Sequence, residues 1–411
     1  MTRGLVGSPA AALPCLAVLA AAVIACGGGT GGTGETGDGD TTPPPGQSTD
    51  TLPPGQSTAA QVAAALGRSS HFLIGLGNDL SSDYDHDKDG AYTLGVTLDL
   101  HYAYLVGLPG AGGWSDWNQG GTFVNILTDS AKSHGVTPMF TLWTMAAWGD
   151  GNLAVVTNDQ FMSAYWEGMK LLFQRLAAFD GPALVHLEPD FWAYAQRSFP
   201  DPTAMAVHVG SLEPDCAGLP EDLTGMGKCL VRLARTYAPK VMVGFHASGW
   251  ASDDGGADVA QYLLQLGAGD SDLVVLDVLD RDAGCFEAHT DPQCQRGSAS
   301  DAWYWDETNA TSPNFREHLA WAKDLSDTAG KALLWWQMPL GVPSSTRGGE
   351  AGHYRDNRVR YLFSHVDEFV AAGGVGAVFG VGAGNQTYIT TDGGQFKDAV
   401  TAYFASPTPL P

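Results

Sequence analysis

Eight short apolar runs, spaced along the chain between longer amphipathic segments, constrain the fold more than any other feature of this sequence. Each run is nearly continuous in apolar residues, as expected for strands of a parallel sheet that helices cover. Eight such strands close a barrel, so we predict a (β/α)8 or TIM barrel. The predicted strands span 71–77, 94–100, 137–143, 183–188, 240–246, 271–277, 331–337 and 374–380, and the predicted helices span 122–133, 160–179, 219–237, 258–266, 315–328, 357–371 and 394–404.

The connection between the first two predicted strands departs from this pattern. Only 16 residues separate them, and these residues are acidic, include glycine and show no helical period. The first crossover helix is therefore predicted to be missing or replaced by a loop. A doubly wound open sheet is the alternative fold, although no glycine-rich phosphate loop follows the first strand.

The N-terminal 58 residues carry an export signal and a linker. Arg3 precedes an apolar run, 13–24, that is too short to span a membrane but suits a signal peptide. The run ends in Val-Ile-Ala-Cys, which resembles the bacterial lipobox, so 1–26 is predicted to be a lipoprotein signal peptide with Cys26 lipidated. A plain secretory signal is the alternative. Residues 27–58, with a repeated Pro-Pro-Gly-Gln-Ser-Thr, are predicted to be a disordered linker, and 59–411 the barrel domain.

This organisation predicts an exported protein that its lipid anchors to a bacterial membrane, at the outer membrane or cell surface. The membrane is expected to be contacted only through that lipid, and the barrel is expected to be a monomer. A formal net charge of −24 argues against nucleic acid and other polyanions as partners.

Cysteine usage agrees with export to an oxidising compartment. Once the two N-terminal cysteines are assigned to the signal and the lipid, four remain. Their spacings of 13 and 9 residues favour two local disulfides, Cys216–Cys229 and Cys285–Cys294, among three connectivities. A zinc site is the alternative, but no CxxC or HxxxH spacing supports it.

Polar side chains recur late in the predicted strands, where a barrel carries its active site. Side chains alternate between the lumen and the helix layer, and buried charge is costly without partners. A converging set of polar residues at the strand ends therefore indicates a functional site. These residues are Asp99, His101, His186, Glu188, Asp190, His246, Asp277, Asp280 and Gln337.

Tryptophans gather at the same strand ends and in the loops that follow them. Exposed tryptophan costs solubility unless it binds a flat, partly apolar partner, and sugar rings are such partners. We therefore predict a saccharide groove. Its candidate substrate-binding residues are Trp143, Trp148, Trp192, Trp250, Trp303, Trp305 and Trp336, with Asn385 after the last strand.

Two segments resemble glycoside hydrolase family 6, the inverting cellulases. Glu188-Pro189-Asp190 is similar to that family's E-P-D, and 244–250 is similar to its G-x-H-x-x-G-W. The resemblance implies that Asp190 is the general acid. The family's Asp before the Gly-His is Val243 here. Clan A barrel glycosidases are the second comparison: Glu188 matches their strand-four acid/base, but their strand-seven nucleophile falls at Gln337.

These residues predict a glycoside hydrolase that acts on a polysaccharide with a pair of carboxyl groups. Glu188 or Asp190 would be the proton donor, and Asp277, Asp280 or Asp99 the second carboxylate, while three polar residues (His101, His246 and Gln337) would orient substrate hydroxyls. A non-catalytic surface glycan-binding lipoprotein on a barrel is one alternative. A barrel deacetylase or phosphodiesterase with a metal at its scattered histidines is another.

No cofactor is expected for catalysis, but one loop suggests a structural calcium ion. Asp85, Asp87 and Asp89 stand at positions 1, 3 and 5 of a calcium-loop pattern, with Gly90 at position 6. Position 12 is Val96 instead of glutamate. A plain solvated acidic loop is the alternative.

Overall fold

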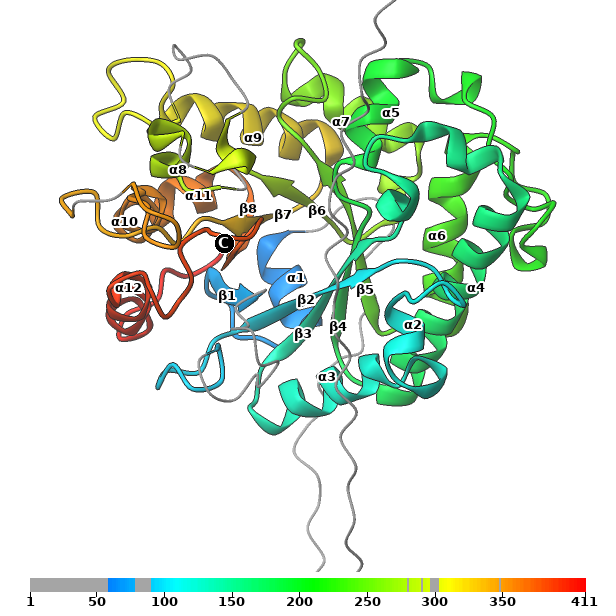
Figure 1. The fold of residues 1–411 in the computed structure, drawn as a ribbon, viewed down its shortest axis with the longest axis horizontal. Helices are drawn as coiled ribbons and strands as arrows, with labels where there is room; N and C mark the ends of the chain where they lie inside the picture. Colours follow the sequence, from blue (N-terminus) through cyan, green and yellow to red (C-terminus); the bar gives the residue numbers. More distant parts are fainter. Residues whose placement is uncertain (1–57, 78–89, 279–280, 290, 296–302, 347–348) are drawn as a thin grey trace, which may run out of the picture. The chain divides into compact units, whose positions relative to one another are not determined.

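Eight parallel strands close into a barrel in the order β1 to β8 (Figure 1). The computed structural model describes residues 58–77, 90–278, 281–289, 291–295, 303–346 and 349–411. The predicted (β/α)8 fold is confirmed. The strands are β1 (Leu73–Gly77), β2 (Leu100–Val106), β3 (Thr137–Trp143), β4 (Ala183–Leu187), β5 (Val241–Ala247), β6 (Leu273–Asp277), β7 (Leu333–Met338) and β8 (Gly374–Gly380).

Helices ring the barrel, and local sequence signals set their ends (Figure 1). The Asn158 side chain caps the longest helix, α4, and Asn314 and Glu317 form a capping box at the start of α9. The segment predicted as one helix, 357–371, is two helices that meet at His365. The helices are α1 (Ala59–Ala65), α2 (Trp114–Trp117), α3 (Phe123–Ser133), α4 (Asp159–Phe179), α5 (Phe191–Ser198), α6 (Leu223–Tyr237), α7 (Gly256–Gln265), α8 (Ala283–Ala288), α9 (Phe315–Ala329), α10 (Arg358–Ser364), α11 (Val366–Ala371) and α12 (Gln395–Phe404).

The second strand lies further along the chain than predicted. Residues 90–99 form turns and bends with no helix among them, and β2 begins at Leu100, which pairs with Gly75 of β1 and Thr137 of β3. A Cβ placed on Gly77 or Gly380 would overlap Tyr102, so these glycines make room for that ring. The prediction of 94–100 as the strand was wrong, because the residues that pair with β1 and β3 begin only at Leu100.

The amino-terminal end of the barrel is closed by α1 and by the C-terminal tail. Thr58 caps α1, whose Val62 and Ala63 are fully buried. The Thr137 hydroxyl, at the start of β3, donates to the Leu66 carbonyl over 2.8 Å. The tail pairs with the segment before β1, since the backbone N–H of Phe72 donates to Thr408 over 2.9 Å. The polypeptide therefore enters and leaves the barrel at the end opposite the strand C-termini.

Both predicted disulfides are present. Cys216–Cys229 joins a 3-10 turn to α6, and Cys285–Cys294 joins α8 to the turn that follows it. Cys285 and Cys294 pack with Phe286 and Tyr354 in a small cluster separate from the main core. Within the described part of the chain, no helix has the length and hydropathy needed to cross a membrane.

Candidate active site

A chain of hydrogen-bonded side chains runs through the barrel lumen from β3 to the end of β5 and stops beside Asp277 of β6. Thr141 Oγ1 lies 3.2 Å from His186 Nδ1, and His186 Nε2 lies 2.9 Å from His246 Nδ1. His246 Nε2 lies 3.0 Å from the Ser248 hydroxyl and 3.5 Å from Asp277 Oδ1. Four members are buried, whereas the Asp277 side chain is 20% exposed at the end of β6. The chain therefore leads from a closed interior to one accessible carboxylate.

The proton positions of the two imidazoles are linked. His186 Nε2 and His246 Nδ1 share one hydrogen bond of 2.9 Å, so one of these nitrogens donates and the other accepts. With the Thr141 hydroxyl donating to His186 Nδ1, His186 Nε2–H donates to His246 Nδ1. Burial, and then the neighbouring His246, lower the pKa of His186 well below its usual value, so this ring is neutral.

Trp336 of β7 forms an aromatic wall beside the two imidazoles. Its ring centroid lies 4.9 Å from that of His186, 5.6 Å from that of His246 and 5.8 Å from that of Tyr104. The side chain of the next residue, Gln337, also lies in the lumen, where its Nε2 donates to the Tyr104 hydroxyl over 2.6 Å. Two successive side chains can both lie in the lumen because the β7–β8 register shifts here and Gln337 has φ +55°.

Glu188 departs from the alternation that its strand predicts. Its φ of +46° ends β4, and its Oε2 accepts from the backbone N–H groups of Thr144 and Met145, both over 2.9 Å. The residue is fully buried. Burial raises the pKa of Glu188 to about 7. The two backbone donors and the Tyr165 hydroxyl have the opposite, smaller effect, because they favour the ionised carboxylate. The carboxyl thus joins the loop after β3 to the end of β4 and is closed to solvent.

Asp190 lies two residues further, where the chain turns into α5. It has φ +68°, is partly buried and precedes α5 without capping it through its side chain. Positive φ at non-glycine residues is costly, and three of the seven described residues that adopt it lie at the ends of β4 and β7: Glu188, Asp190 and Gln337. The other four are Asp180, His289, Asn309 and Asn385, so this backbone feature does not by itself locate a site.

Two predicted site residues lie at the wrong end of the barrel. Asp99 precedes β2, where its carboxylate accepts from the Ile74 backbone N–H and lies 3.1 Å from His71 Nε2. His101 is the second residue of β2 and contacts the Tyr92 hydroxyl at 3.2 Å. Placing them beside the other site residues was wrong, because the strand begins at Leu100 instead of ending there. Asp280, Asp85, Asp87, Asp89 and Cys26 lie outside the described residues.

The predicted tryptophans separate into buried and accessible groups. Trp192 is 1% exposed and donates to the Leu187 carbonyl, Trp303 stacks on Phe286 at 3.9 Å, and Trp305 packs on Phe315. These three have structural contacts that account for them. Trp143 is partly buried beside Tyr104, while Trp148 is 46% and Trp250 37% exposed. Asn385 is exposed, and its carbonyl accepts from the Gly352 backbone N–H.

A second group of buried charges holds the loops after β6, β7 and β8. Asp282 accepts from the backbone N–H groups of Gly341 and Thr387, and Asp356 accepts from that of Ala283 and from the Arg358 guanidinium. Burial, and then the Asp356 charge, raise the pKa of Asp282 to about 7. No sequence pattern predicts this group, because its members come from separate loops.

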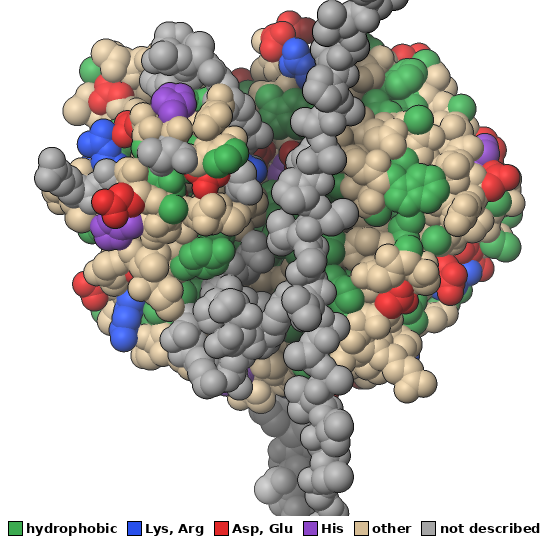
Figure 2. All heavy atoms as spheres, viewed as in Figure 1, with side chains coloured by type: hydrophobic (Ala, Val, Ile, Leu, Met, Phe, Trp, Pro, Cys, Tyr) green, Lys and Arg blue, Asp and Glu red, His purple; other side chains and the backbone are tan. Residues whose placement is uncertain are grey.

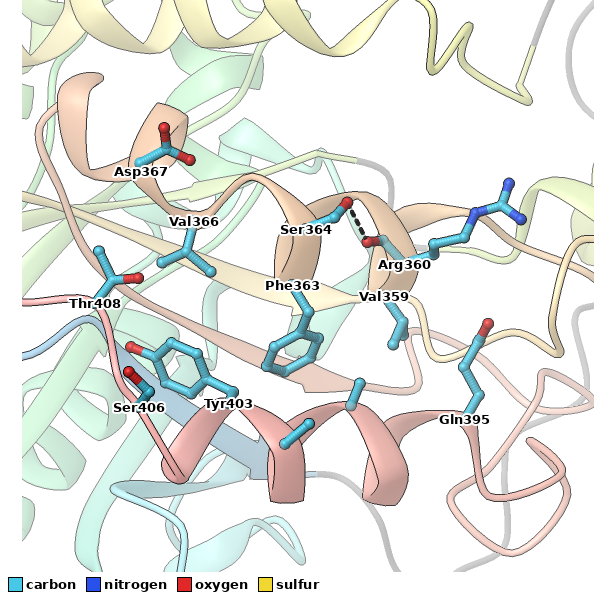
Figure 3. Close-up of a pocket in the computed structure, with 12 residues that line it drawn as sticks. Val359, Arg360, Phe363, Ser364, Val366, Asp367, Gln395, Tyr403, Ser406 and Thr408 are labelled. Atoms are coloured by element: carbon cyan, nitrogen blue, oxygen red, sulfur yellow. Dashed lines mark hydrogen bonds between the residues drawn. The ribbon is translucent and has the colours of Figure 1, made fainter.

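A cavity of about 630 Å³ lies away from the strand ends. It opens in the outer helix layer between α10, α11 and α12, with Phe363 and Tyr403 in its wall and Thr408 near the amino-terminal end of the barrel (Figure 3). Its size alone does not make it the active site, since it holds no converging polar groups like those of the lumen.

The face drawn in Figure 2 carries more acidic than basic side chains, in line with the formal net charge of −24. Figure 2 shows carboxylates distributed around the rim of one face, with basic side chains in between at fewer places. Among the residues that the structure describes, no group of three or more His, Cys, Asp or Glu side chains is arranged to hold a metal ion.

The fold and the site define a TIM-barrel protein with a polar lumen, and comparisons with known proteins assign no family. No family model matches the sequence, and no curated protein matches it. Among solved structures, D-psicose 3-epimerase from Clostridium cellulolyticum H10 is 12% identical, with 81% of this chain and 99% of that chain covered and a TM-score of 0.41. An endoglucanase from Humicola insolens is 11% identical (67% and 81% covered, TM-score 0.34), and a family 10 endo-β-1,4-xylanase is 10% identical (78% and 88%, TM-score 0.40). At these values the likenesses carry no argument about chemistry.

Proposed function

We propose that this protein is an extracytoplasmic glycoside hydrolase that cleaves a polysaccharide at the C-terminal mouth of the barrel. The observation that carries the proposal is Asp277, an accessible carboxylate held against His246 beside the Trp336 ring. Carboxylates that meet aromatic ring faces in a concave polar site suit sugars, which need acid/base groups at the glycosidic bond and flat surfaces under the ring.

Glycosidic cleavage needs one carboxylic acid and one carboxylate, and the chain offers two carboxyl groups at the ends of β4 and β6, which β5 separates. Asp190 is the proton donor of the proposal, because full burial closes Glu188 to a substrate. Asp277 is the second carboxylate, which attacks the sugar or activates water. His246 lies 3.5 Å from Asp277, and Ser248 holds the same imidazole in place. Trp143, which is partly buried, supplies a ring for sugar contact, and Trp336, which is 4% exposed, packs behind the two imidazoles.

A non-catalytic glycan-binding protein is the second candidate, and two observations favour it. The strand-seven position of a barrel glycosidase nucleophile is Gln337, whose amide is engaged by Tyr104 and Val381. The glutamate at the end of strand four is fully buried. A barrel with a sugar-binding lumen and no turnover would show the same features.

The test compares the mature chain with its Asp277→Asn and Asp190→Asn variants on a panel of β-glucans, xylans, mannans, chitin and peptidoglycan. New reducing ends are measured, and Asp327→Asn, a surface carboxylate paired with Lys323, is the control. We expect each site variant to lose about 10²–10⁴-fold in rate and the control to lose none. Retention on a glycan without release by any form would instead establish the binding protein.

Lipid anchoring and a calcium ion are further parts of the proposal. Two disulfides support an oxidising compartment, and the sequence supports lipidation at Cys26. Metabolic labelling with an alkyne fatty acid should mark the full chain and not its Cys26→Ala variant. A structural calcium ion at Asp85, Asp87 and Asp89 predicts a rise in thermal midpoint with calcium that is lost in Asp87→Asn.

A further inference from the structure

A second, smaller pocket lies outside the lumen, between α5 and α7. It has a volume of about 300 Å³, at the lower end of the range for small-molecule sites. Its wall is polar and mixes neutral amides with charges: Gln196, Arg197, Asp253, Asp254, Asp258 and Gln261. The loop after β5 supplies part of this wall, so the pocket lies on the flank of the barrel toward the strand C-termini. None of the proposed catalytic groups lines it.

An exposed aromatic ring stands directly beside this pocket. Trp250 precedes Ala251 of the pocket wall and is 37% exposed. Tyr194 of α5 packs against it at 4.8 Å between ring centroids, and Arg197 donates to its carbonyl over 2.7 Å. Trp250 is one of three large hydrophobic side chains exposed in the described part of the chain; the others are Trp148 and Ile126. The ring is therefore held in place by an edge-on contact with Tyr194 and remains partly exposed.

A buried hydroxyl in the pocket wall lacks a partner. Tyr262 of α7 is 2% exposed, and no described residue forms a hydrogen bond with its hydroxyl. A buried tyrosine hydroxyl normally finds a partner, because leaving it unpaired costs free energy. Nearby, the Gln196 amide is held by Asp258 over 2.9 Å. The pocket wall thus offers a donor, fixed amides and carboxylate acceptors within one small volume.

We propose that this pocket and the Trp250 ring form a second carbohydrate-binding site, outside the lumen, for neutral sugar units. A flat ring beside a polar cavity fits the apolar face and the hydroxyl edge of a pyranose. Three aspartates against one arginine disfavour an anionic sugar. The proposal takes its ligand class from the proposed function. The site would hold a polysaccharide chain on the enzyme between cleavage events.

Affinity electrophoresis tests the site by binding alone, with the Asp277→Asn chain as background so that turnover does not interfere. Native gels contain hydroxyethyl cellulose or soluble xylan, and retardation gives the dissociation constant. We expect Trp250→Ala and Tyr262→Phe to weaken binding of at least one polymer threefold or more. Ile126→Ala, which removes an exposed hydrophobic side chain from α3, should leave it unchanged. Tyr262→Phe removes only a hydroxyl and keeps the buried ring, so it guards against misfolding.

The outcomes separate this site from the proposed function. Unchanged retardation in both pocket variants would overturn the second site, even if the wild-type chain releases reducing ends. Weakened binding in both variants, with no release from any polymer, would support the site and reject hydrolysis. Displacement of the polymer by spermidine would assign the pocket to cations and overturn the sugar assignment.

Discussion

The pair of imidazoles in the lumen sets the chemistry at the scale of single residues. His186 and His246 share one hydrogen bond of 2.9 Å, so the proton position on one ring decides that on the other. Among the described residues, His186 forms hydrogen bonds with Thr141 and His246, and His246 lies 3.5 Å from Asp277. In the proposed hydrolase His186 is therefore a positioning residue, because it reaches Asp277 only through His246.

His186 should remain neutral throughout the ordinary pH range. Burial lowers its pKa well below the usual histidine value, so its ring should not gain a proton between pH 5 and pH 8. Heteronuclear NMR of ¹⁵N-histidine-labelled protein measures both the charge and the tautomer, and the His186→Asn variant assigns the signal. We expect a shift pattern with Nε2 protonated and no titration. A His186 signal that titrates near pH 6.5 would contradict the lumen geometry.

Because the Glu188 carboxyl is buried, we expect the free energy of unfolding to depend on pH. Its pKa is about 7 in the fold and about 4.5 as a free side chain, so the folded protein favours the protonated form. This contribution is fully present below pH 4.5 and is lost as the pH rises through 7. The loss is about 3 kcal/mol, at about 1.4 kcal/mol per pKa unit for a fully buried group.

Glu188→Gln should remove that dependence. The amide oxygen can accept from the Thr144 and Met145 N–H groups without ionising. Urea unfolding of both proteins at pH 4.5 and pH 8 gives the difference, and other groups that titrate, such as Asp282, cancel because both proteins keep them. We expect the wild type to lose about 3 kcal/mol relative to the variant over this range. Parallel curves would mean that the carboxyl is not buried as described.

At the scale of elements, the loops after β6, β7 and β8 depend on buried charges more than on helix or strand contacts. Asp356 joins α8 to the start of α10, and its partner Arg358 is fully buried. The Arg358 guanidinium also lies 4.8 Å from the Trp305 ring and donates to the Trp303 carbonyl. This arrangement explains why these two tryptophans pack inward instead of lining a groove.

Helix α10 carries one buried and one partly exposed ion pair, Arg358–Asp356 and Arg360–Glu307, whose contributions to stability can be compared. Asp356→Ala should destabilise the protein by about 3–5 kcal/mol, because it leaves the Arg358 charge buried without its partner. Glu307→Ala removes the partner of Arg360, which is about half exposed, and should cost less than about 1 kcal/mol. Guanidinium unfolding measures both. Equal costs would show that the Arg358 group is hydrated in solution.

At the scale of the whole molecule, the barrel has two functionally different ends. Residue 58 and the C-terminal tail lie at the amino-terminal end, and Asp277 and Asp190 lie at the opposite one. A linker that joins the barrel at α1 would leave the strand C-termini facing away from the point of attachment. This polarity suits the proposed anchored hydrolase, whose substrate would approach from the medium.

Two N-terminal truncations should show where the residues that stabilise the barrel begin. Deleting 1–57 should leave the thermal midpoint unchanged, because 1–26 is the predicted signal peptide and 27–57 is poor in residues that can form a core. Deleting 1–69 also removes α1 and exposes the surface that Val62, Ala63 and Leu66 bury, so the midpoint should fall by several degrees. Differential scanning calorimetry of both proteins gives the comparison. An equal midpoint in the two truncations would mean that α1 does not stabilise the barrel.

The fold could be predicted from the sequence, because the signals that specify it are local. Apolar runs and capping residues such as Asn158 and Asn314 place seven of the eight strands and all of the predicted helices within a few residues of their observed positions. The cysteine spacings likewise determined the disulfides, since short loops favour local pairing.

Which polar residues meet depends on contacts between distant parts of the chain. Alternation along a strand predicts a side chain's direction only while the backbone stays extended, and Glu188 and Gln337 have positive φ. The pairing of Leu100 with Gly75 of β1 and Thr137 of β3 fixes where β2 begins and leaves Asp99 at the amino-terminal end of the barrel. Contacts between residues far apart in the sequence fix the site, and no local pattern carries that information.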